Sequence, residues 1–179
     1  MMKIEKETQV TLDLAQKSDL PEFRRKLQEA FALAVIETFG DCDYGPIPSD
    51  RDVQESFDAP TAVVYHILQA GKTVGGVVLR IDSKTHHNSL DLFFVSPEHH
   101  SKGIGIAAWQ AVEAHYPETV AWETVTPYFE KQNINFYVNK CGFHIVEFYN
   151  QYHTDPNMHQ PEHEDPGTKE FFRFQKMMK

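Results

Sequence analysis

Hydrophobic and polar residues follow two different periods in the N-terminal part of the chain. Over Val10–Leu14 every second residue is apolar, which predicts a half-buried strand. Apolar residues then recur at three- and four-residue spacing behind the capping residues Ser18 and Asp19, and this pattern stops near Gly40. The second pattern predicts a long amphipathic helix.

A loop, a short helix and a hairpin are expected next. Residues 40–48 are dense in Gly, Pro and Asp, and Ser49 or the residue after it can cap a short helix. Ala62–Gln69 and residues 73–81 are rich in β-branched and aromatic residues and are separated by a tight turn, which predicts a hairpin. The glycine pair at 75–76 predicts a bulge in its second strand.

The C-terminal half alternates strands with two helices. A helix face starts at Ile104 and must end before Pro117, and a second helix is expected over 128–140, closed by Gly142. The strand over 89–95 is continuously apolar, which indicates a central position in the sheet. The strands expected in this half span 89–95, 120–125, His144–Tyr149 and 170–175.

Length and composition limit the class of protein. A chain of 179 residues is expected to form one domain over residues 1–179. Hydrophobic residues make up 41% and charged residues 24%, which excludes a fibrous or wholly disordered protein. The net charge of −9 disfavours a protein that binds nucleic acid through phosphates. It suits a cationic small partner, or reflects no more than a solvated acidic surface.

The cysteine content and the lengths of the apolar runs indicate the cellular compartment in which the protein is expected. Cys42 and Cys141 are the two cysteines, and their spacing indicates neither a disulfide framework nor a thiolate zinc site. The first residues alternate Lys and Glu, and no run of 18 apolar residues occurs. We therefore expect a cytoplasmic protein without membrane association.

The most informative segment joins the strand over 89–95 to the following helix. It reads Val95-Ser-Pro-Glu-His-His-Ser-Lys-Gly-Ile-Gly105. A helix N-terminus presents unpaired N–H groups and the positive end of the helix dipole, and Gly103 and Gly105 allow close approach of a ligand. The segment indicates a phosphate or pyrophosphate site, with a purely structural turn as the alternative. It matches neither the P-loop nor the Rossmann glycine pattern.

This segment resembles the signature of the GCN5-related N-acetyltransferase (GNAT) superfamily. That signature is a strand ending in Val-x-Pro, then Gln/Arg-x-x-Gly-x-Gly/Ala and a helix, and here His100 stands at the Gln/Arg position. A second motif, Asn133-Ile-Asn-Phe-Tyr-Val-Asn-Lys-Cys-Gly-Phe143, resembles the tyrosine-containing helix of the family. The resemblance implies an α/β (α+β) fold with a mixed, mostly antiparallel, splayed sheet of six to seven strands flanked by helices.

The resemblance also implies acetyl-CoA as the acetyl donor, held where the fourth and fifth strands splay apart. Backbone groups of Phe93 and Val95 would pair with the pantetheine arm and the thioester carbonyl. Lys102 would add a cation beside the phosphates, and it is equally well interpreted as an exposed loop lysine. The other residues that the resemblance places at the cofactor are His100, Ser101, Gly103, Ile104, Gly105, Asn133 and Tyr137.

The implied reaction is direct attack of a primary amine on the thioester. An amine with a pKa near 10 must lose a proton, and an acid assists the departing thiolate. Tyr137 is the candidate acid, although it lies five residues before Gly142 where many relatives have four, a rotation of about 100°. Asp91 and Glu123 are the candidate bases. Each acid alternatively faces solvent or forms a structural ion pair.

Two polar loops are expected to border the acceptor. The first carries Asp41, Asp43, Asp50 and Asp52, and an acidic rim there would favour a small cationic amine. The second carries His153, His159, Glu162, His163 and Glu164. We interpret it as a solvated acceptor loop and expect no metal, because its spacings match no compact metal motif.

Two other function classes stay open. One is a non-catalytic acyl-CoA sensor or interaction module that keeps the glycine turn but lacks a working base. The other is a metal- or partner-binding domain built on the His-rich loop. Since relatives of the family often pair, a homodimer is a further expectation.

Overall fold

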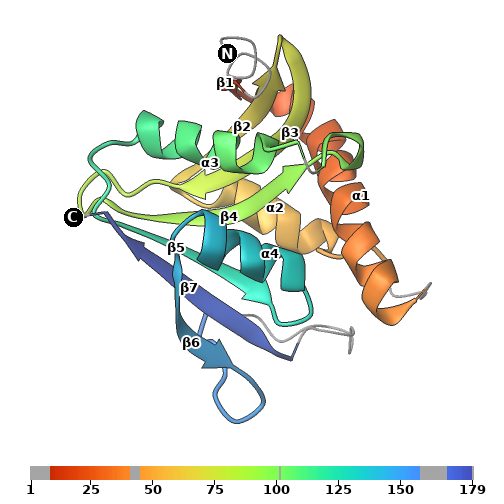
Figure 1. The fold of residues 1–179 in the computed structure, drawn as a ribbon, viewed down its shortest axis with the longest axis vertical. Helices are drawn as coiled ribbons and strands as arrows, with labels where there is room; N and C mark the ends of the chain where they lie inside the picture. The colour runs from red at the N-terminus through yellow and green to blue at the C-terminus, as the bar shows by residue number, and fades with distance from the viewer. Residues whose placement is uncertain (1–8, 41–44, 101, 158–168, 179) are drawn as a thin grey trace.

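The computed structural model describes residues 9–40, 45–100, 102–157 and 169–178. These residues form one seven-stranded sheet in the order β1-β2-β3-β4-β5-β7-β6 (Figure 1). The β4–β5 pair is parallel and every other pair is antiparallel, so the expected mixed sheet is confirmed. The strands are β1 (Val10–Leu14), β2 (Ala62–Gln69), β3 (Lys72–Arg80), β4 (His87–Val95), β5 (Ala121–Pro127), β6 (His144–Tyr149) and β7 (Phe171–Met177).

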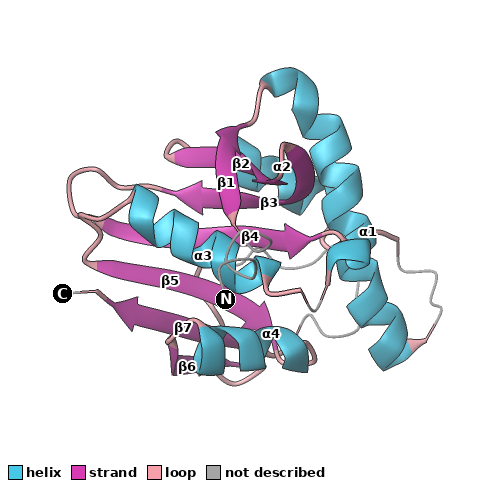
Figure 2. Ribbon diagram, turned by 45° about the horizontal axis from the view of Figure 1, so that its top comes forward, coloured by secondary structure: helices cyan, strands magenta, loops and turns pink. Residues whose placement is uncertain are grey.

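The helices cover the two faces of this sheet in pairs (Figures 1 and 2). Phe23 and Leu27 of α1 and Val53 of α2 pack on Val78 and Phe94 from one face. The second pair, α3 and α4, lies on the other face, where the tryptophans of α3 and β5 meet in the largest buried cluster. The helices are α1 (Leu20–Phe39), α2 (Asp50–Asp58), α3 (Ile104–His115) and α4 (Lys131–Asn135), which continues as a π-helical turn over Phe136–Lys140.

Local sequence signals place most of these boundaries within a few residues. Ser49 caps α2, since its hydroxyl accepts the Asp52 N–H at 3.1 Å. Asp19 is the N-cap residue of α1 as expected, but its side chain makes no hydrogen bond to that helix: the carboxylate accepts the Gln16 N–H at 2.9 Å and lies 3.2 Å from the ring of His66. The helix expected over 128–140 starts only at Lys131, because Pro127 still pairs with β7.

Neighbouring atoms leave no room for a Cβ at positions 75 and 76 of β3. The register of β2 and β3 shifts so that Ile67 faces Gly75 and Leu68 faces Thr73, which leaves Val74 as the extra residue of a bulge. A Cβ on Gly75 would lie 2.3 Å from the backbone oxygen of Phe94, and one on Gly76 would lie 2.3 Å from the ring of Phe23. Both glycines therefore let β4 and α1 pack closely on β3.

No helix within the described residues combines the length and apolar character that crossing a membrane requires.

Candidate active site

The central strands β4 and β5 separate half-way along their length. Their parallel pairing runs from His87 opposite Ala121 to Leu90 opposite Thr124, although both strands continue for several residues. At the same point β4 bulges, because Leu79 pairs with Leu90 and Val78 with Leu92, so that Asp91 is the extra residue. Beyond it, within the described residues, β4 and β5 form no pairs. The β5 side of residues 92–95 is therefore a strand edge that an extended ligand can pair with.

The turn at the end of β4 carries the predicted anion site. Gly103 adopts a left-handed conformation with φ of 75°, which glycine reaches without strain, and Ile104 starts α3. The Ile104 side chain is buried, so only its backbone is available to a ligand. The first N–H groups of this helix have no partner within the helix. Lys102 is exposed beside them, and Ser101 lies outside the described residues.

His100 ties this turn back to the strand. Its ring nitrogen Nε2 donates to the Val95 carbonyl at 2.6 Å. Backbone groups of Val95 are expected to pair with the cosubstrate, and one of the two lone pairs of this carbonyl remains for such a bond. His100 therefore fixes the loop in place of the usual Gln or Arg.

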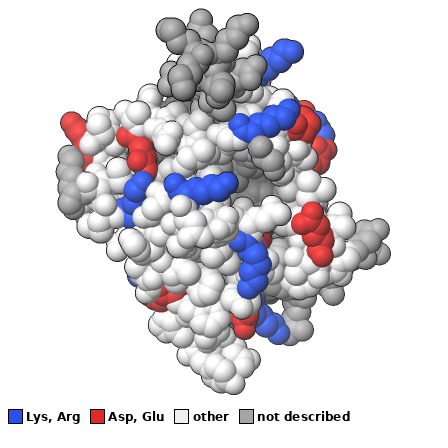
Figure 3. Space-filling view, viewed as in Figure 1, with Lys and Arg blue, Asp and Glu red and all other residues white. Residues whose placement is uncertain are grey.

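Helices α3 and α4 approach one another over Gly105. A Cβ there would lie 3.2 Å from Cε2 of Phe136 and 4.0 Å from Cε1 of Phe93. Those two rings stack with their centroids 5.8 Å apart and their planes 18° apart. Figure 3 shows a hollow in this face of the molecule, with Lys and Arg side chains on several sides and Asp or Glu side chains on another.

Tyr137 lies at the point where the strands separate. Its hydroxyl hydrogen-bonds with Thr124, and the Thr124 hydroxyl donates to the Leu90 carbonyl at 2.9 Å, at the last β4–β5 pair. Burial and the nearby Glu130 charge raise the pKa of the Tyr137 phenol, while the Thr124 hydrogen bond opposes the rise. The side chain is almost completely buried, with 6% of the residue exposed.

The extra residue before Gly142 is absorbed by the π-helical turn. Cys141 N–H donates to the Phe136 carbonyl at 3.0 Å, five residues back, and Phe143 N–H donates to the Tyr137 carbonyl at 2.9 Å. The wider turn accommodates one extra residue without rotating the preceding part of the helix, so the Tyr137 side chain still faces Thr124. Single π turns of this kind occur often at functional sites.

Glu130 is a buried acid that the sequence analysis missed. It directly precedes α4, it is 5% exposed, and its Oε2 accepts a hydrogen bond from Asn133 Nδ2. Burial raises its pKa to about 7, and the Asn133 hydrogen bond opposes this rise. Asn133 was expected to contact the cofactor, and here its amide holds Glu130. A glutamate at a helix start is common, so no local signal in the sequence indicates that this one is buried.

The first candidate base, Asp91, is engaged in an ion pair. Its Oδ2 accepts from Arg80 Nε at 2.6 Å, and a further hydrogen bond comes from Ser56 of α2. Burial raises the pKa of Asp91, and Arg80 opposes that rise. Asp91 therefore lies on the α1/α2 face of the sheet, at the bulge where the strands separate.

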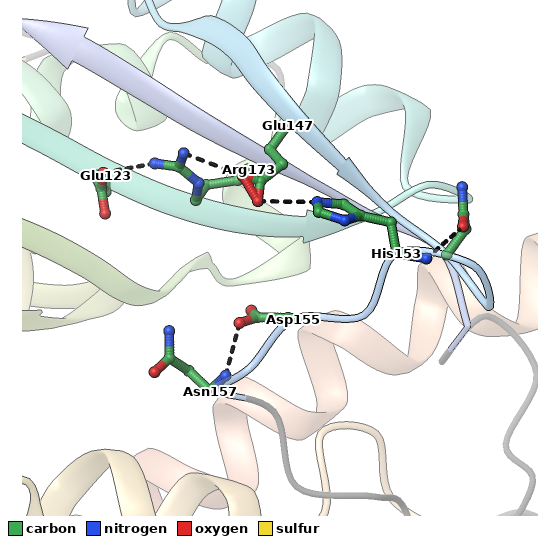
Figure 4. Close-up of polar contacts among 7 residues, drawn as sticks. Glu123, Glu147, His153, Asp155, Asn157 and Arg173 are labelled. Carbon is green, nitrogen blue, oxygen red and sulfur yellow. Dashed lines mark hydrogen bonds and ion pairs between the residues drawn. The ribbon is translucent and has the colours of Figure 1, made fainter.

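The second candidate base, Glu123, belongs to a charged network on the same face (Figure 4). Its Oε1 accepts from Arg173 Nη1 at 2.7 Å and from Gln175 Nε2 at 3.4 Å. Arg173 Nη2 also donates to Glu147 at 3.4 Å, and the His153 ring nitrogen lies 3.3 Å from Glu147. Adjacent strand residues point to opposite faces, so Glu123 lies opposite Thr124 and Tyr137. The structure therefore does not bring the two candidate bases together with the candidate acid.

The two expected acceptor loops are only partly described. Asp50 accepts from Gln28 at 2.8 Å and lies 3.8 Å from Arg24, so it helps to join α1 to α2. Asp41 and Asp43 of the same loop lie outside the described residues, as do His159, Glu162, His163 and Glu164 of the other loop. The parts of both loops that are described contain no group of three His, Cys, Asp or Glu side chains arranged for a metal.

Comparison with known proteins identifies this architecture. The sequence model of the Acetyltransferase (GNAT) family matches residues 22–143, which contain the strand separation, the glycine turn and Tyr137. The chain belongs to this family. An uncharacterized protein of Bacillus subtilis (strain 168), YrkN, is 70% identical over 182 residues, covering 99% of this chain and 98% of that protein.

Solved structures of GNAT proteins share the fold at low sequence identity. The IAA acetyltransferase from Bacillus cereus ATCC 14579 superposes with a TM-score of 0.65 at 18% identity, covering 94% of this chain and 99% of that one. The spermidine N-acetyltransferase from Vibrio cholerae in complex with CoA and spermine gives a TM-score of 0.64 at 12% identity, covering 94% and 95%. These likenesses confirm the expected fold class.

Membership makes the chain an acyltransferase that uses acetyl-CoA, as the resemblance implied. The residues present fit that cosubstrate. The unpaired edge of β4 suits the amides of pantetheine, and the first turn of α3 suits the pyrophosphate. The absence of a side chain at Gly105 lets the ring of Phe136 lie close to α3, because a Cβ there would lie only 3.2 Å from that ring.

Proposed function

We propose that this GNAT protein acetylates the primary amine of a small cationic molecule, by direct attack on acetyl-CoA in a ternary complex. The observation that carries the proposal is the separation of β4 from β5 at the Asp91 bulge, with the Tyr137 hydroxyl at its apex. A thioester paired with the β4 edge would lie beside that hydroxyl. The amine would approach the thioester from the opposite face of the sheet.

The charges on that opposite face support a cationic acceptor. Glu123 and Glu147 lie there against the guanidinium of Arg173 (Figure 4), and Asp155 lies close enough to the neighbouring Tyr149 to raise the pKa of its phenol. Hydrogen bonds from Tyr149, His153 and Arg173 hold the pKa of Glu147 below its ordinary value, so it stays ionised at neutral pH. An acidic rim attracts ammonium groups and raises their local concentration. The net charge of −9 acts in the same direction.

The transfer joins the amine nitrogen to the acetyl carbon and breaks the carbon–sulfur bond. The nitrogen loses one proton and the sulfur of the departing CoA gains one. Asp91 and Glu123 are the acids that border the amine side, and each already binds an arginine. Water held by either carboxylate would take up the proton of the amine.

An amine panel tests this function. Spermidine, spermine, lysine, an aminoglycoside and a peptide with a free N-terminus are each incubated with acetyl-CoA, and acetylated product is measured by mass spectrometry. We expect acetylation of at least one polycationic small amine, with intersecting initial-velocity lines that indicate a ternary complex. Parallel lines would contradict direct attack. If acetyl-CoA raises the melting temperature but no amine is acetylated, the chain is an acyl-CoA sensor instead.

A further inference from the structure

The rings of Phe93 and Phe136 form a stacked pair between β4 and the α4 segment. Their centroids lie 5.8 Å apart and their planes are inclined by 18°. Phe93 also packs against the cluster that contains Ile104 and Ala108 of α3, so the pair joins three elements on one face of the sheet (Figure 1). Both rings belong to residues that are only partly buried, which leaves apolar surface of the pair for a further contact.

The pair lies between the two places that are expected to hold the ends of acetyl-CoA. The first turn of α3, which begins at Ile104, is expected to bind the pyrophosphate, and the Tyr137 hydroxyl lies where β4 and β5 separate. Phe93 belongs to the unpaired edge of β4, and Phe136 directly precedes Tyr137, with the two rings 5.5 Å apart. A ligand held at both ends therefore passes the Phe93–Phe136 pair.

We propose that Phe136 is a cosubstrate-binding residue whose ring, stacked on Phe93, forms the apolar wall of the passage for the pantetheine arm. The amides of pantetheine can pair with the edge of β4, but its methylene and methyl groups need an apolar surface. Sequence motifs assigned only backbone groups of Phe93 and no role to Phe136. The proposal depends on the use of acetyl-CoA and is independent of the amine that is acetylated.

The position of the Phe136 ring depends on Gly105 of α3. A Cβ at position 105 would lie 3.2 Å from Cε2 of that ring, closer than side chains normally pack, but 4.0 Å from the Phe93 ring, an ordinary contact distance. An added methyl group would therefore displace the Phe136 ring and leave Phe93 in place. The backbone of Phe136 is fixed separately, because its carbonyl accepts the Cys141 N–H at 3.0 Å.

Calorimetric titration with three ligands separates the pantetheine arm from the nucleotide. Acetyl-CoA and CoA carry pantetheine, whereas 3′-phospho-ADP is the nucleotide half alone. Phe136→Ala should weaken the binding of acetyl-CoA and of CoA by about 10-fold each, the effect of losing roughly 50 Å² of apolar contact. Its affinity for 3′-phospho-ADP should stay within twofold of the wild type, because the first turn of α3 is unchanged.

The matched control is Phe148→Ala. Phe148 is 39% exposed and its ring packs on Phe172 of β7, at the edge of the sheet away from β4. The same truncation of an aromatic ring there should leave the affinity for all three ligands within twofold of the wild type.

Two conservative variants distinguish an apolar wall from a merely structural ring. Phe136→Leu keeps an apolar side chain at the passage, so it should bind acetyl-CoA within about threefold of the wild type. Phe136→Gln is of similar length but polar, so it should bind acetyl-CoA as weakly as Phe136→Ala. This pair also carries the test if Phe136→Ala does not fold.

A double-mutant cycle tests whether the ring stands at the passage beside Gly105. Gly105→Ala should weaken the binding of acetyl-CoA by about fivefold, because the displaced Phe136 ring narrows the passage. In the Phe136→Ala background the same change should have less than a twofold effect, because no ring remains to be displaced. Equal effects in both backgrounds would show that the ring does not stand at the passage, and would overturn the proposal.

The outcomes are separable from the proposed function, because binding is measured without an amine. An affinity of Phe136→Ala for acetyl-CoA within twofold of the wild type overturns the proposal. An equal loss of affinity for acetyl-CoA and 3′-phospho-ADP also overturns it, because the ring would then act through the pyrophosphate turn. A wild type that binds acetyl-CoA but acetylates no amine removes the proposed function and leaves the role of Phe136 intact.

Discussion

Replacing Gly75 by alanine is expected to lower the free energy of unfolding by about 3 kcal/mol, the upper end of what overpacking costs. The added Cβ would lie 2.3 Å from the backbone oxygen of Phe94 and 3.1 Å from Cα of Val95. Both obstacles are backbone atoms of β4, which a rotamer change cannot move. Either β3 or β4 must shift, and the shift falls on the segment proposed to pair with pantetheine.

Thermal unfolding checks this expectation. A loss of about 3 kcal/mol corresponds to a drop of roughly 6–12 °C in melting temperature for a chain of this length. Thr73→Ala, an exposed change two residues earlier on the same strand, is the control and should stay within 2 °C of the wild type. The added stabilisation by acetyl-CoA should shrink only in Gly75→Ala. A melting temperature within 2 °C of the wild type for Gly75→Ala would contradict the steric account.

The second large effect is a pH-dependent gain in stability when Glu130 is replaced by glutamine. The pKa of Glu130 rises from its ordinary 4.5 to about 7 on folding, which corresponds to about 3 kcal/mol. The folded state therefore holds the proton more tightly than the unfolded state. This contribution to stability is fully present below pH 4.5 and is lost as the pH rises through about 7.

Urea unfolding of both proteins at pH 4.5, 5, 6, 7 and 8 measures this difference. Glutamine does not ionise, so the wild type should lose about 3 kcal/mol relative to Glu130→Gln between pH 4.5 and pH 8, most of it between pH 5 and pH 7. Carboxylates elsewhere titrate alike in both proteins and cancel in the comparison. Parallel curves over the whole range would show that Glu130 ionises normally in the folded state.

Much of the architecture could be predicted from the sequence, because local chemistry decides it. The alternation over Val10–Leu14, the cap at Ser49 and the glycine at position 103 each fix a local conformation that tertiary packing does not override. The order of glycines after a Val-Ser-Pro strand end likewise pointed to the acetyl-CoA family, which the family comparison confirms.

The candidate site was less predictable because it depends on partners far away in the chain. Glu123 reads as a lone acid on a strand, and its arginine partner stands 50 residues later on β7. Burial of Glu130 follows from the packing of α4 on the sheet, which no local pattern reveals. The π-helical turn accommodates the extra residue between Tyr137 and Gly142, and no local sequence pattern predicts it.

Hydrogen–deuterium exchange with and without acetyl-CoA shows whether the donor pairs with the free edge of β4 and the first turn of α3. We expect slower exchange at residues 92–95 and 103–107 when acetyl-CoA is bound, with Ala62–Gln69 of β2 unchanged. Unchanged exchange at 92–95 in a protein that acetyl-CoA demonstrably stabilises would contradict this pairing, since the donor would then lie elsewhere.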